Sequence, residues 1–423
     1  MPADKLSSRR ALLSGSASLA AAALLPACAA DIAQVGAGGG VSSPVALRRN
    51  AGAPGPLAGR MLVLGELQGG NDGINTLVPI GQPAYRRLRP AIAIPAEDTI
   101  PLDDAQALHP ELRPLVAAYG NGEMAIINAV GYPRPNRSHF RSIEIWEQAT
   151  DSDRYADRGW VTRALAEHPL LGRGGRADAD AIVVGAGTIG PLAGPGTRVV
   201  TLRDARQFLA QSEALRSVDL RSDATDSLRH VVRTQNEAVG AAGAVRRKLS
   251  GRNRFDRRFG GDPFGRSLAL AADLIADGVD VPVWKATIGS FDTHADQPAR
   301  HARLLGRLAA GLAALREAMI DLGRWNDTLV VTYSEFGRRA AENGSRGTDH
   351  GTAAPLFVLG GAVDGGIRGA PPDLEALVDG DIRAQTDFRS VYAGILAGWW
   401  ETPDNFLARQ GHQPIAATRQ RIA

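Results

Sequence analysis

Short apolar runs alternate along the chain with longer segments in which apolar residues recur every three or four positions. The runs are typical of buried β-strands, and the longer spacing is typical of amphipathic helices. The predicted strands are Arg60–Leu67, Met124–Val130, Ala181–Val184, Arg198–Leu202, Val281–Ile288, Thr328–Tyr333 and Ala354–Leu359. The predicted helices include Glu111–Tyr119, Pro263–Asp277, Ala299–Leu322 and Thr386–Trp400. Because the two kinds of element alternate, we expect an α/β fold with a mainly parallel sheet and helices on both faces.

The two ends of the chain depart from this pattern. Residues 1–30 carry Arg9 and Arg10 ahead of an Ala/Leu-rich run, which indicates a twin-arginine export signal and a periplasmic or extracytoplasmic location. The run is too short and too rich in alanine for a membrane span of about 20 residues. Residues 31–59, rich in Gly, Ala, Ser and Pro, predict a flexible linker. Residues 60–405 then form the expected folded domain, and residues 406–423 are interpreted as a C-terminal tail.

Cys28 is the only cysteine, so neither an intrachain disulfide nor a cysteine metal site is expected. The sequence Leu-Pro-Ala-Cys at 25–28 resembles a lipobox, in which Cys28 would carry a lipid anchor. The alternative is ordinary cleavage between small residues, with Cys28 removed. Both alternatives stay open at this point.

The composition is that of a globular protein, with 44% hydrophobic and 22% charged residues among 423. The 48 basic and 45 acidic residues are interspersed and give a net charge of +3. Because the sequence has no basic stripe with interleaved aromatic residues, nucleic acid is not an expected partner.

Residues able to bind a metal ion follow several of the predicted strands. They are Asp72, Asp292, His294, Glu335, Asp349 and His350. In open α/β sheets, ligands bind beyond the carboxyl ends of the strands, so these side chains are expected to converge. Carboxylates together with imidazoles suit a divalent ion, with zinc the first expectation and Mn, Mg or Ca as alternatives. Taken one by one, each residue could also serve an ordinary turn.

Ser138 lies where a helix should begin after the strand Met124–Val130. A serine at this position is either a helix cap or, beside a metal ion, a nucleophile. Arg137 and Arg141 flank it and are candidates for holding an anionic substrate group.

The sequence argues against two other kinds of site, a dinucleotide-binding site and a nucleophile-elbow serine hydrolase. Residues 185–190 match the G-x-G-x-x-G dinucleotide fingerprint, but Pro191 and the early arrival of the next strand exclude the crossover helix that this site requires. A serine hydrolase of the nucleophile-elbow type would need a G-x-S-x-G between strand and helix, and the sequence lacks it there.

Several motifs resemble the DUF1501 family of exported bacterial proteins, which is similar to the alkaline phosphatase and sulfatase superfamily. They are QGGNDGIN at 68–75, SHF at 138–140, FDTHADQ at 291–297, SEFGRRAAEN at 334–343 and GTDHG at 347–351. The resemblance covers nearly all of residues 60–400 and implies an alkaline phosphatase-like fold. It implies that Asp72 is a metal-binding aspartate, Ser138 the nucleophile, and Asp292 with His294 a metal-binding pair.

The resemblance leaves the last ligands open between two registers. In one register, Glu335 ends a strand as a ligand and His350 is the final histidine. In the other, Asp349 and His350 form an Asp-His pair and the final histidine is missing. Either way one expected ligand is absent. The sequence thus predicts an exported, metal-dependent hydrolase of phosphate or sulfate esters, acting on a small-molecule or polymer substrate. The alternative is a non-catalytic envelope binding protein on the same fold.

Overall fold

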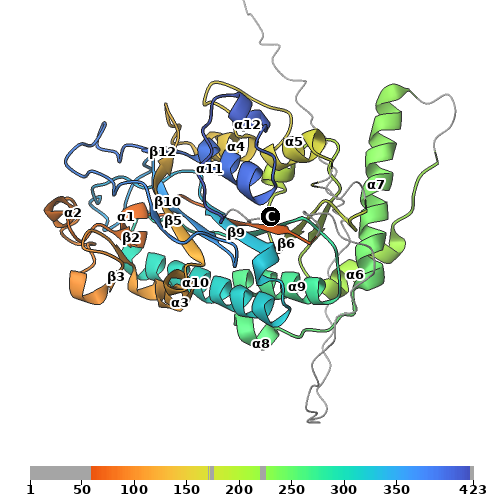
Figure 1. Ribbon diagram of the computed structural model, residues 1–423, viewed down its shortest axis with the longest axis horizontal. Helices are drawn as coiled ribbons and strands as arrows, with labels where there is room; N and C mark the ends of the chain where they lie inside the picture. Colours follow the sequence, from red (N-terminus) through yellow and green to blue (C-terminus); the bar gives the residue numbers. More distant parts are fainter. Residues whose placement is uncertain (1–58, 170, 172–175, 220–224, 420–423) are drawn as a thin grey trace, which may run out of the picture. The chain divides into compact units, whose positions relative to one another are not determined.

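The computed structural model describes residues 59–169, 171, 176–219 and 225–419. The predicted export signal, Cys28 and all but the last residue of the predicted linker lie outside this part of the chain. The described residues build one unit around a central sheet, with helices on its two faces (Figure 1).

The central sheet has nine strands in the described chain. Eight of them follow the order β11-β5-β10-β9-β1-β8-β6-β7, and β12 pairs with β5. Their bounds are β1 Met61–Leu67, β5 Met124–Gly131, β6 Ala181–Val184, β7 Val199–Leu202, β8 Val283–Ile288, β9 Thr328–Tyr333, β10 Ala354–Leu359, β11 Gly366–Arg368 and β12 Thr386–Asp387. Only β10 runs antiparallel to its neighbours β5 and β9. The prediction of a mainly parallel sheet is therefore confirmed.

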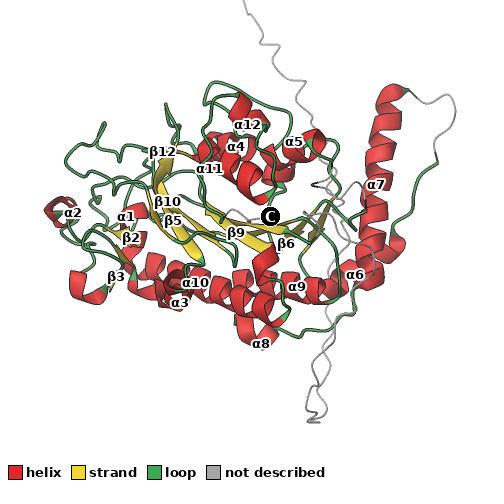
Figure 2. Ribbon diagram, viewed as in Figure 1, coloured by secondary structure: helices red, strands yellow, loops and turns green. Residues whose placement is uncertain are grey.

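The sheet is buried on both faces because its strands are apolar on both sides. In β1, Val63 belongs to one core cluster, whereas Leu62 and Leu64 belong to the other. The first cluster also takes residues from α3 Val116–Gly120, α6 Ala205–Ala214, α7 Asp226–Lys248, α8 Asp256–Phe259, α9 Pro263–Ala276 and α10 Gln297–Asp321. The second takes residues from α4 His139–Gln148, α5 Trp160–Glu167, α11 Phe388–Gly394 and α12 Phe406–Arg409. Figure 2 shows these helices on both sides of the strands.

Smaller elements lie around the sheet. A three-stranded antiparallel sheet in the order β2-β4-β3 is formed by Leu77–Val78, Ala107–Leu108 and Ile100–Pro101. The short helices α1 Gly73–Thr76 and α2 Pro83–Leu88 lie close to it in sequence. The 3₁₀ turns are Ala96–Asp98, Pro110–Leu115, Gly190–Leu192 and Trp325–Asp327. The turn at Gly190–Leu192, and no long helix, stands between β6 and β7, which agrees with the exclusion of a dinucleotide site.

Two expectations differ from the structure near the C-terminus. The predicted helix Thr386–Trp400 begins as strand β12 and passes from α11 into a π turn at Ile395–Trp399. The segment interpreted as a tail from residue 406 is packed as far as the described chain extends. Phe406 and Leu407 are buried in the same core cluster as α4, and Val363 pairs with Thr418. The folded domain therefore includes residues 406–419.

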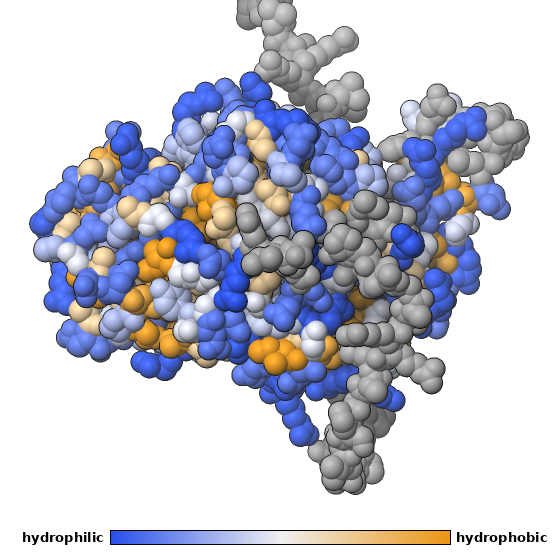
Figure 3. Space-filling view, viewed as in Figure 1, coloured by the Kyte–Doolittle hydropathy of each residue, from blue (hydrophilic) through white to orange (hydrophobic). Residues whose placement is uncertain are grey.

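The face of the described chain in Figure 3 is mainly hydrophilic, with apolar groups in small separate patches. Within the described residues, none of the helices combines the length and the apolar character that a membrane span requires.

Candidate metal centre

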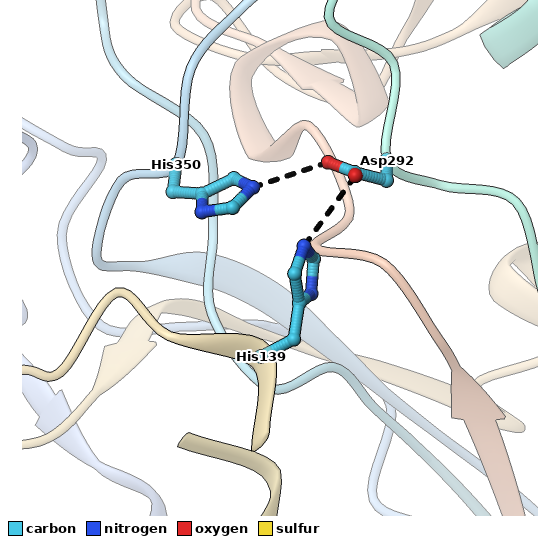
Figure 4. A group of neighbouring side chains, drawn as sticks. All are labelled: His139, Asp292 and His350. Carbon is cyan, nitrogen blue, oxygen red and sulfur yellow. Dashed lines mark hydrogen bonds and ion pairs between the residues drawn. The ribbon is translucent and has the colours of Figure 1, made fainter. Parts of the chain in front are cut away.

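Three loops bring His139, Asp292 and His350 together at one edge of the sheet. His139 is the first residue of α4, Asp292 follows β8, and His350 precedes β10. One ligand atom from each residue lies within 4.8 Å of the others, and Figure 4 shows both imidazoles directed at the carboxylate. This is a group of side chains that could hold a metal ion.

The sheet topology explains why residues so far apart in sequence meet. The carboxyl ends of the parallel strands β1, β8 and β9 lie at one edge. Because β10 runs antiparallel to β9, its amino end lies at that same edge. The loop before β10 therefore reaches the site from the opposite chain direction.

Two glycines allow the loops to approach each other this closely. A Cβ on Gly69, whose φ is +118°, would lie 2.4 Å from the backbone nitrogen of Asp292. A Cβ on Gly347 would lie 2.2 Å from the carbonyl carbon of His294. Any side chain at either position would push the loops that carry the candidate ligands apart. The glycine-rich turn at 68–75 therefore packs directly against the backbone of the loop that carries Asp292.

Each imidazole at the site is oriented by an oxygen atom that accepts a hydrogen bond from its Nδ1. Nδ1 of His139 donates to Oε1 of Glu335 at 2.8 Å, and Nδ1 of His350 donates to the carbonyl oxygen of Arg137 at 2.8 Å. Nδ1 of His294 donates to Oδ1 of Asp349 at 3.2 Å. With Nδ1 protonated, Nε2 of a neutral imidazole carries the free lone pair that a metal ion needs.

The free Nε2 atoms converge on Asp292. Nε2 of His294 lies 2.9 Å from Oδ1 of Asp292, and Nε2 of His350 lies 3.2 Å from the same oxygen. The Nε2 atoms of His294 and His350 are 3.0 Å apart, and Nε2 of His139 lies 3.5 Å from Oδ2 of Asp292. Ligand atoms bound to a tetrahedral zinc ion at about 2.0–2.1 Å are separated by about 3.3 Å. These four separations fall around that value, and the ligand atoms of His139, Asp292 and His350 all lie within 4.8 Å of one another.

One buried atom at the site has no hydrogen-bond partner among the described residues. It is Nε2 of His139, on an imidazole whose Nδ1 is already committed to Glu335. A buried polar atom without a hydrogen bond is costly, so Nε2 of His139 is expected to bind a further group such as a metal ion. The donor set of imidazole nitrogens and a carboxylate fits a divalent transition-metal ion.

The pKa values of these groups keep the carboxylate charged. Burial disfavours the charge on Asp292, but the hydrogen bond and the charge of Arg338 outweigh burial and lower its pKa to about 2. The hydrogen bond to Glu335 raises the pKa of His139. Burial lowers the pKa of His350, which favours the neutral imidazole that binds metals.

Arg338 is a fixed positive charge behind the site. Its side chain is fully buried, and its Nη2 donates to Oδ1 of Asp292 at 2.5 Å. Other guanidinium hydrogen bonds go to carbonyl oxygens, including those of Gly70 at 2.8 Å and Thr348 at 2.9 Å, and Nη1 also lies 3.5 Å from Nε2 of His294. Arg338 thus joins the loops after β1 and β8 to the loop before β10, and it holds Asp292 in place.

The charges around the imidazoles leave room for a dication. The carboxylates of Asp292, Glu335 and Asp349 carry three negative charges, and the guanidinium of Arg338 carries one positive charge. A bound metal ion requires neutral imidazoles, and in that state two negative charges remain. The residues present therefore fit a divalent metal ion in charge as well as in donor type.

The predicted metal-binding residues fall into three groups. Asp292, His294 and His350 meet at the cluster, whereas Glu335 and Asp349 contact it by orienting imidazoles. Asp72 is held elsewhere, in a fully buried ion pair with Nη1 of Arg89 at 2.6 Å. Burial opposes its charge, but Arg89 outweighs burial and keeps the pKa of Asp72 below its ordinary value. An arginine already compensates the charge that Asp72 was expected to offer to a metal.

Ser138 is exposed at the start of α4, and the structure gives it no capping hydrogen bond to that helix. Its hydroxyl therefore lies free beside His139. The two arginines expected to bind substrate have protein partners. Arg137 pairs with Asp381, and Arg141 donates to the carbonyl oxygens of Ser152 and Arg154.

Neither His139 nor Arg338 was among the residues predicted to form the site. His139 lies within the SHF motif, directly after the candidate nucleophile and at the start of the helix that follows β5, and this position was a usable signal. The sequence held no such signal for Arg338, because its partners Asp292 and Gly70 lie 46 and 268 positions away from it.

A model of the family described as "Protein of unknown function (DUF1501)" matches residues 116–388. No curated protein matches the chain.

Several solved structures are similar to the chain. The C-terminal periplasmic domain of EcEptC from Escherichia coli, in complex with Zn, is 12% identical, with 72% of this chain and 73% of that chain covered and a TM-score of 0.34. A protein in the alkaline phosphatase superfamily from Vibrio parahaemolyticus is 10% identical, with coverages of 74% and 64% and a TM-score of 0.32. The alkaline phosphatase from the Antarctic bacterium TAB5 is 11% identical, with coverages of 72% and 92% and a TM-score of 0.29.

Proposed function

This chain belongs to the DUF1501 family, as its motifs predicted, and we propose that it is a metal-dependent hydrolase of phosphate or sulfate esters. The observation that carries the proposal is the convergence of imidazole Nε2 atoms on Asp292, among them Nε2 of His139, which makes no hydrogen bond. A buried nitrogen that makes no hydrogen bond is costly, and a bound ion would satisfy it.

The residues that would hold the ion are His139, Asp292 and His350, with His294 beside them. Glu335 and Asp349 orient two of the imidazoles, and the peptide carbonyl of Arg137 orients the third. When bound there, a divalent ion supplies Lewis-acid chemistry, which lowers the pKa of a hydroxyl or water nucleophile and neutralises charge on the ester. Zinc is the first candidate from the donor set, with manganese as the nearest alternative.

The amino end of α4 is suited to the anionic part of the substrate. This helix has ten residues and begins at His139, so its first-turn amides have no acceptor within the helix and lie close in sequence to a candidate ligand. The Ser138 hydroxyl lies at the same helix end, and we propose it or a water molecule as the nucleophile. Because Arg137 and Arg141 have partners within the protein, the anion would rest on the amides and the ion.

We further propose that the protein acts outside the cytoplasm. The support is the twin-arginine pattern at Arg9 and Arg10, with Cys28 as a lipid attachment site if the lipobox is used. Labelling with a radioactive fatty acid in Cys28→Ala and unchanged cells would decide between an anchored and a free mature chain.

The proposal is tested by measuring metal content and ester hydrolysis on the same purified protein. The substrates are 4-nitrophenyl phosphate, bis(4-nitrophenyl) phosphate and 4-nitrophenyl sulfate. We expect hydrolysis of at least one ester, lost in His350→Ala together with the metal. Ser138→Ala should keep the metal, and it should lose turnover if the hydroxyl is the nucleophile. Metal binding without hydrolysis of any ester would instead favour the non-catalytic envelope protein.

A further inference from the structure

The two segments that carry candidate ligands, residues 291–297 and 347–351, also carry three buried polar residues outside the cluster. They are Thr293, Gln297 and Thr348, and each is 0% exposed. A buried polar side chain costs free energy unless it is hydrogen-bonded. The partners of these three side chains therefore indicate what they do.

The side-chain amide of Gln297 joins the two segments. Its Oε1 accepts a hydrogen bond from Oγ1 of Thr293 at 3.0 Å and another from Oγ1 of Thr348 at 2.6 Å. The backbone adds two further bonds: the amide of Thr348 donates to the carbonyl oxygen of Thr293 at 3.3 Å, and the amide of Gln297 donates to that of Arg346 at 2.9 Å. The loop after β8 is thus fastened to the loop before β10.

The nitrogen of the same amide is held by Asp72. Nε2 of Gln297 donates to Oδ2 of Asp72, and this oxygen also accepts from Nη1 of Arg89 at 2.6 Å. Arg89 in turn donates to the carbonyl oxygens of Arg339 and Ala340, each at 2.8 Å. Asp72 is 1% exposed and Arg89 is 0% exposed, so water does not compete for these bonds. Asp72 therefore anchors Gln297, although it does not itself lie at the cluster.

The hydrogen bonds at Gln297 require an amide. Its nitrogen donates to a carboxylate while its oxygen accepts from two hydroxyl groups. A glutamate at this position would have no donor for Asp72 and would place a second negative charge beside it. A methionine has a similar length but offers no hydrogen bond of comparable strength. The choice of side chain therefore follows from the connection that it makes.

The candidate ligands are close neighbours of the two threonines. Asp292 and His294 flank Thr293 in the sequence, and His350 lies two residues after Thr348. Across the loops, Nε2 of His294 and Nε2 of His350 are 3.0 Å apart. Metal–ligand distances tolerate changes of only about 0.2 Å, so a small shift of either loop would weaken the binding of an ion.

We propose that Gln297 is a positioning residue for the metal centre, and that it holds the loop after β8 and the loop before β10 at the separation that the ion requires. Hydrogen bonds run from Arg89 through Asp72 and Gln297 to both loops. None of these three residues is a ligand, so their effect on the ion passes through the loops. The inference rests on the proposed function, because the ion is part of that function.

The test compares the unchanged protein with Gln297→Met, which keeps the length of the side chain and removes its hydrogen bonds. Gln106→Met is the matched control: Gln106 is 1% exposed and exchanges hydrogen bonds of 3.1 and 2.9 Å with Asn128, away from the candidate ligands. Competition with a fluorescent chelator measures zinc affinity, and the visible spectrum of bound Co²⁺ reports coordination geometry. Hydrogen exchange in residues 291–297 and 345–351 of the metal-free protein measures how firmly the loops are held.

We expect Gln297→Met to bind zinc about tenfold more weakly, which is the lower end of the effect of residues that orient metal ligands. The spectrum of bound Co²⁺ should change, and both segments should exchange faster without metal. Gln106→Met should keep the affinity, the spectrum and the exchange rates of the unchanged protein. Unchanged values in Gln297→Met, or an equal loss in Gln106→Met, would overturn the inference.

An exchange of the amide and the carboxylate separates positioning from general destabilisation. Gln297→Glu should bind zinc at least as weakly as Gln297→Met, because two carboxylates then face each other. In the double variant Asp72→Asn/Gln297→Glu, the amide at 72 donates to the carboxylate at 297, which still accepts from both threonines. Its zinc affinity should return toward that of the unchanged protein. A double variant that binds zinc no better than Gln297→Glu would contradict the inference.

Metal binding and ester hydrolysis, measured on the same samples, separate this inference from the proposed function. If the unchanged protein binds zinc and Gln297→Met binds it more weakly, but no ester is hydrolysed, the positioning role stands and the hydrolase is refuted. If esters are hydrolysed and Gln297→Met binds zinc as tightly as the unchanged protein, the hydrolase stands and the positioning role is refuted. A protein that binds no divalent ion would refute both.

Discussion

Exchange of Glu335 for glutamine tests whether His139 is a metal ligand held in a defined orientation. Glu335 is only 1% exposed, and its Oε1 accepts hydrogen bonds from Nδ1 of His139 and from the amide of Gly69, each at 2.8 Å. Glutamine preserves the volume and one acceptor oxygen, but it removes the negative charge that polarises the imidazole. Loss of a carboxylate behind a metal-binding histidine costs about 10- to 100-fold in metal affinity, or ~1.4–2.8 kcal/mol.

Asp349→Asn is the matched comparison for this prediction. Asp349 holds Nδ1 of His294 at 3.2 Å, but its side chain is 57% exposed. Solvent screens this interaction, so we expect the affinity to fall by at most about fivefold. Zinc affinity is measured by competition with a fluorescent chelator at neutral pH, and circular dichroism confirms that both variants fold. An unchanged affinity in Glu335→Gln, or an equal loss in both variants, would refute the role given to His139.

Three further predictions concern the protein around the site. Asp72→Asn should retain the metal but lower the free energy of unfolding by about 3–5 kcal/mol, because the fully buried Arg89 loses its only carboxylate partner among the described residues and keeps neutral acceptors such as Asn75. Loss of metal in this variant would show that Asp72 is a ligand after all. Burial lowers the pKa of His301 to about 3 and that of His109 to about 4. Below about pH 6.5, the unfolded state therefore binds protons at these two imidazoles, whereas they stay neutral in the folded state. Urea titrations should show the free energy of unfolding falling from about pH 6.5 toward pH 4, by about 2 kcal/mol per imidazole at pH 5. His301→Gln should remove one proton from this dependence, and an unchanged slope would contradict the assignment. Leu407→Ala should cost about 2–5 kcal/mol in thermal or urea unfolding, because Leu407 is fully buried, whereas a neutral effect would restore the C-terminal segment to a tail.

The sequence predicted the strands that carry the site with bounds close to those observed. Thr328–Tyr333 and Ala354–Leu359 match β9 and β10, and the strand predicted from Val281 begins two residues later. Buried parallel strands are apolar along their whole length, so the runs are conspicuous in the sequence. The direction of β10 could not be predicted in this way, because the sequence of a six-residue strand does not show whether the strand pairs parallel or antiparallel. Nothing in the sequence therefore predicted that β10 would enter the sheet from the opposite end.

The sequence predicted the site residues that follow or precede strands. It did not predict those whose role depends on a contact with a residue distant in the sequence. Asp292 and His350 meet as expected from their places beside β8 and β10. His139 was missed because its role depends on Glu335, which lies 196 positions away. Asp72 has the same local pattern as a ligand, and only its contact with Arg89, 17 positions further on, distinguishes the two roles. Local patterns report which side chains leave a strand end, whereas pairing across the fold determines what they bind.

The most direct test of the account is the metal content of the purified mature chain after growth in metal-replete medium. Elemental analysis should find one divalent ion per chain, with zinc the first expectation. The ion should be absent from the double variant His139→Ala/His350→Ala and retained in Asp72→Asn. A protein without stoichiometric metal, or an ion that survives the double substitution, would contradict the assignment of the metal centre to His139, Asp292 and His350.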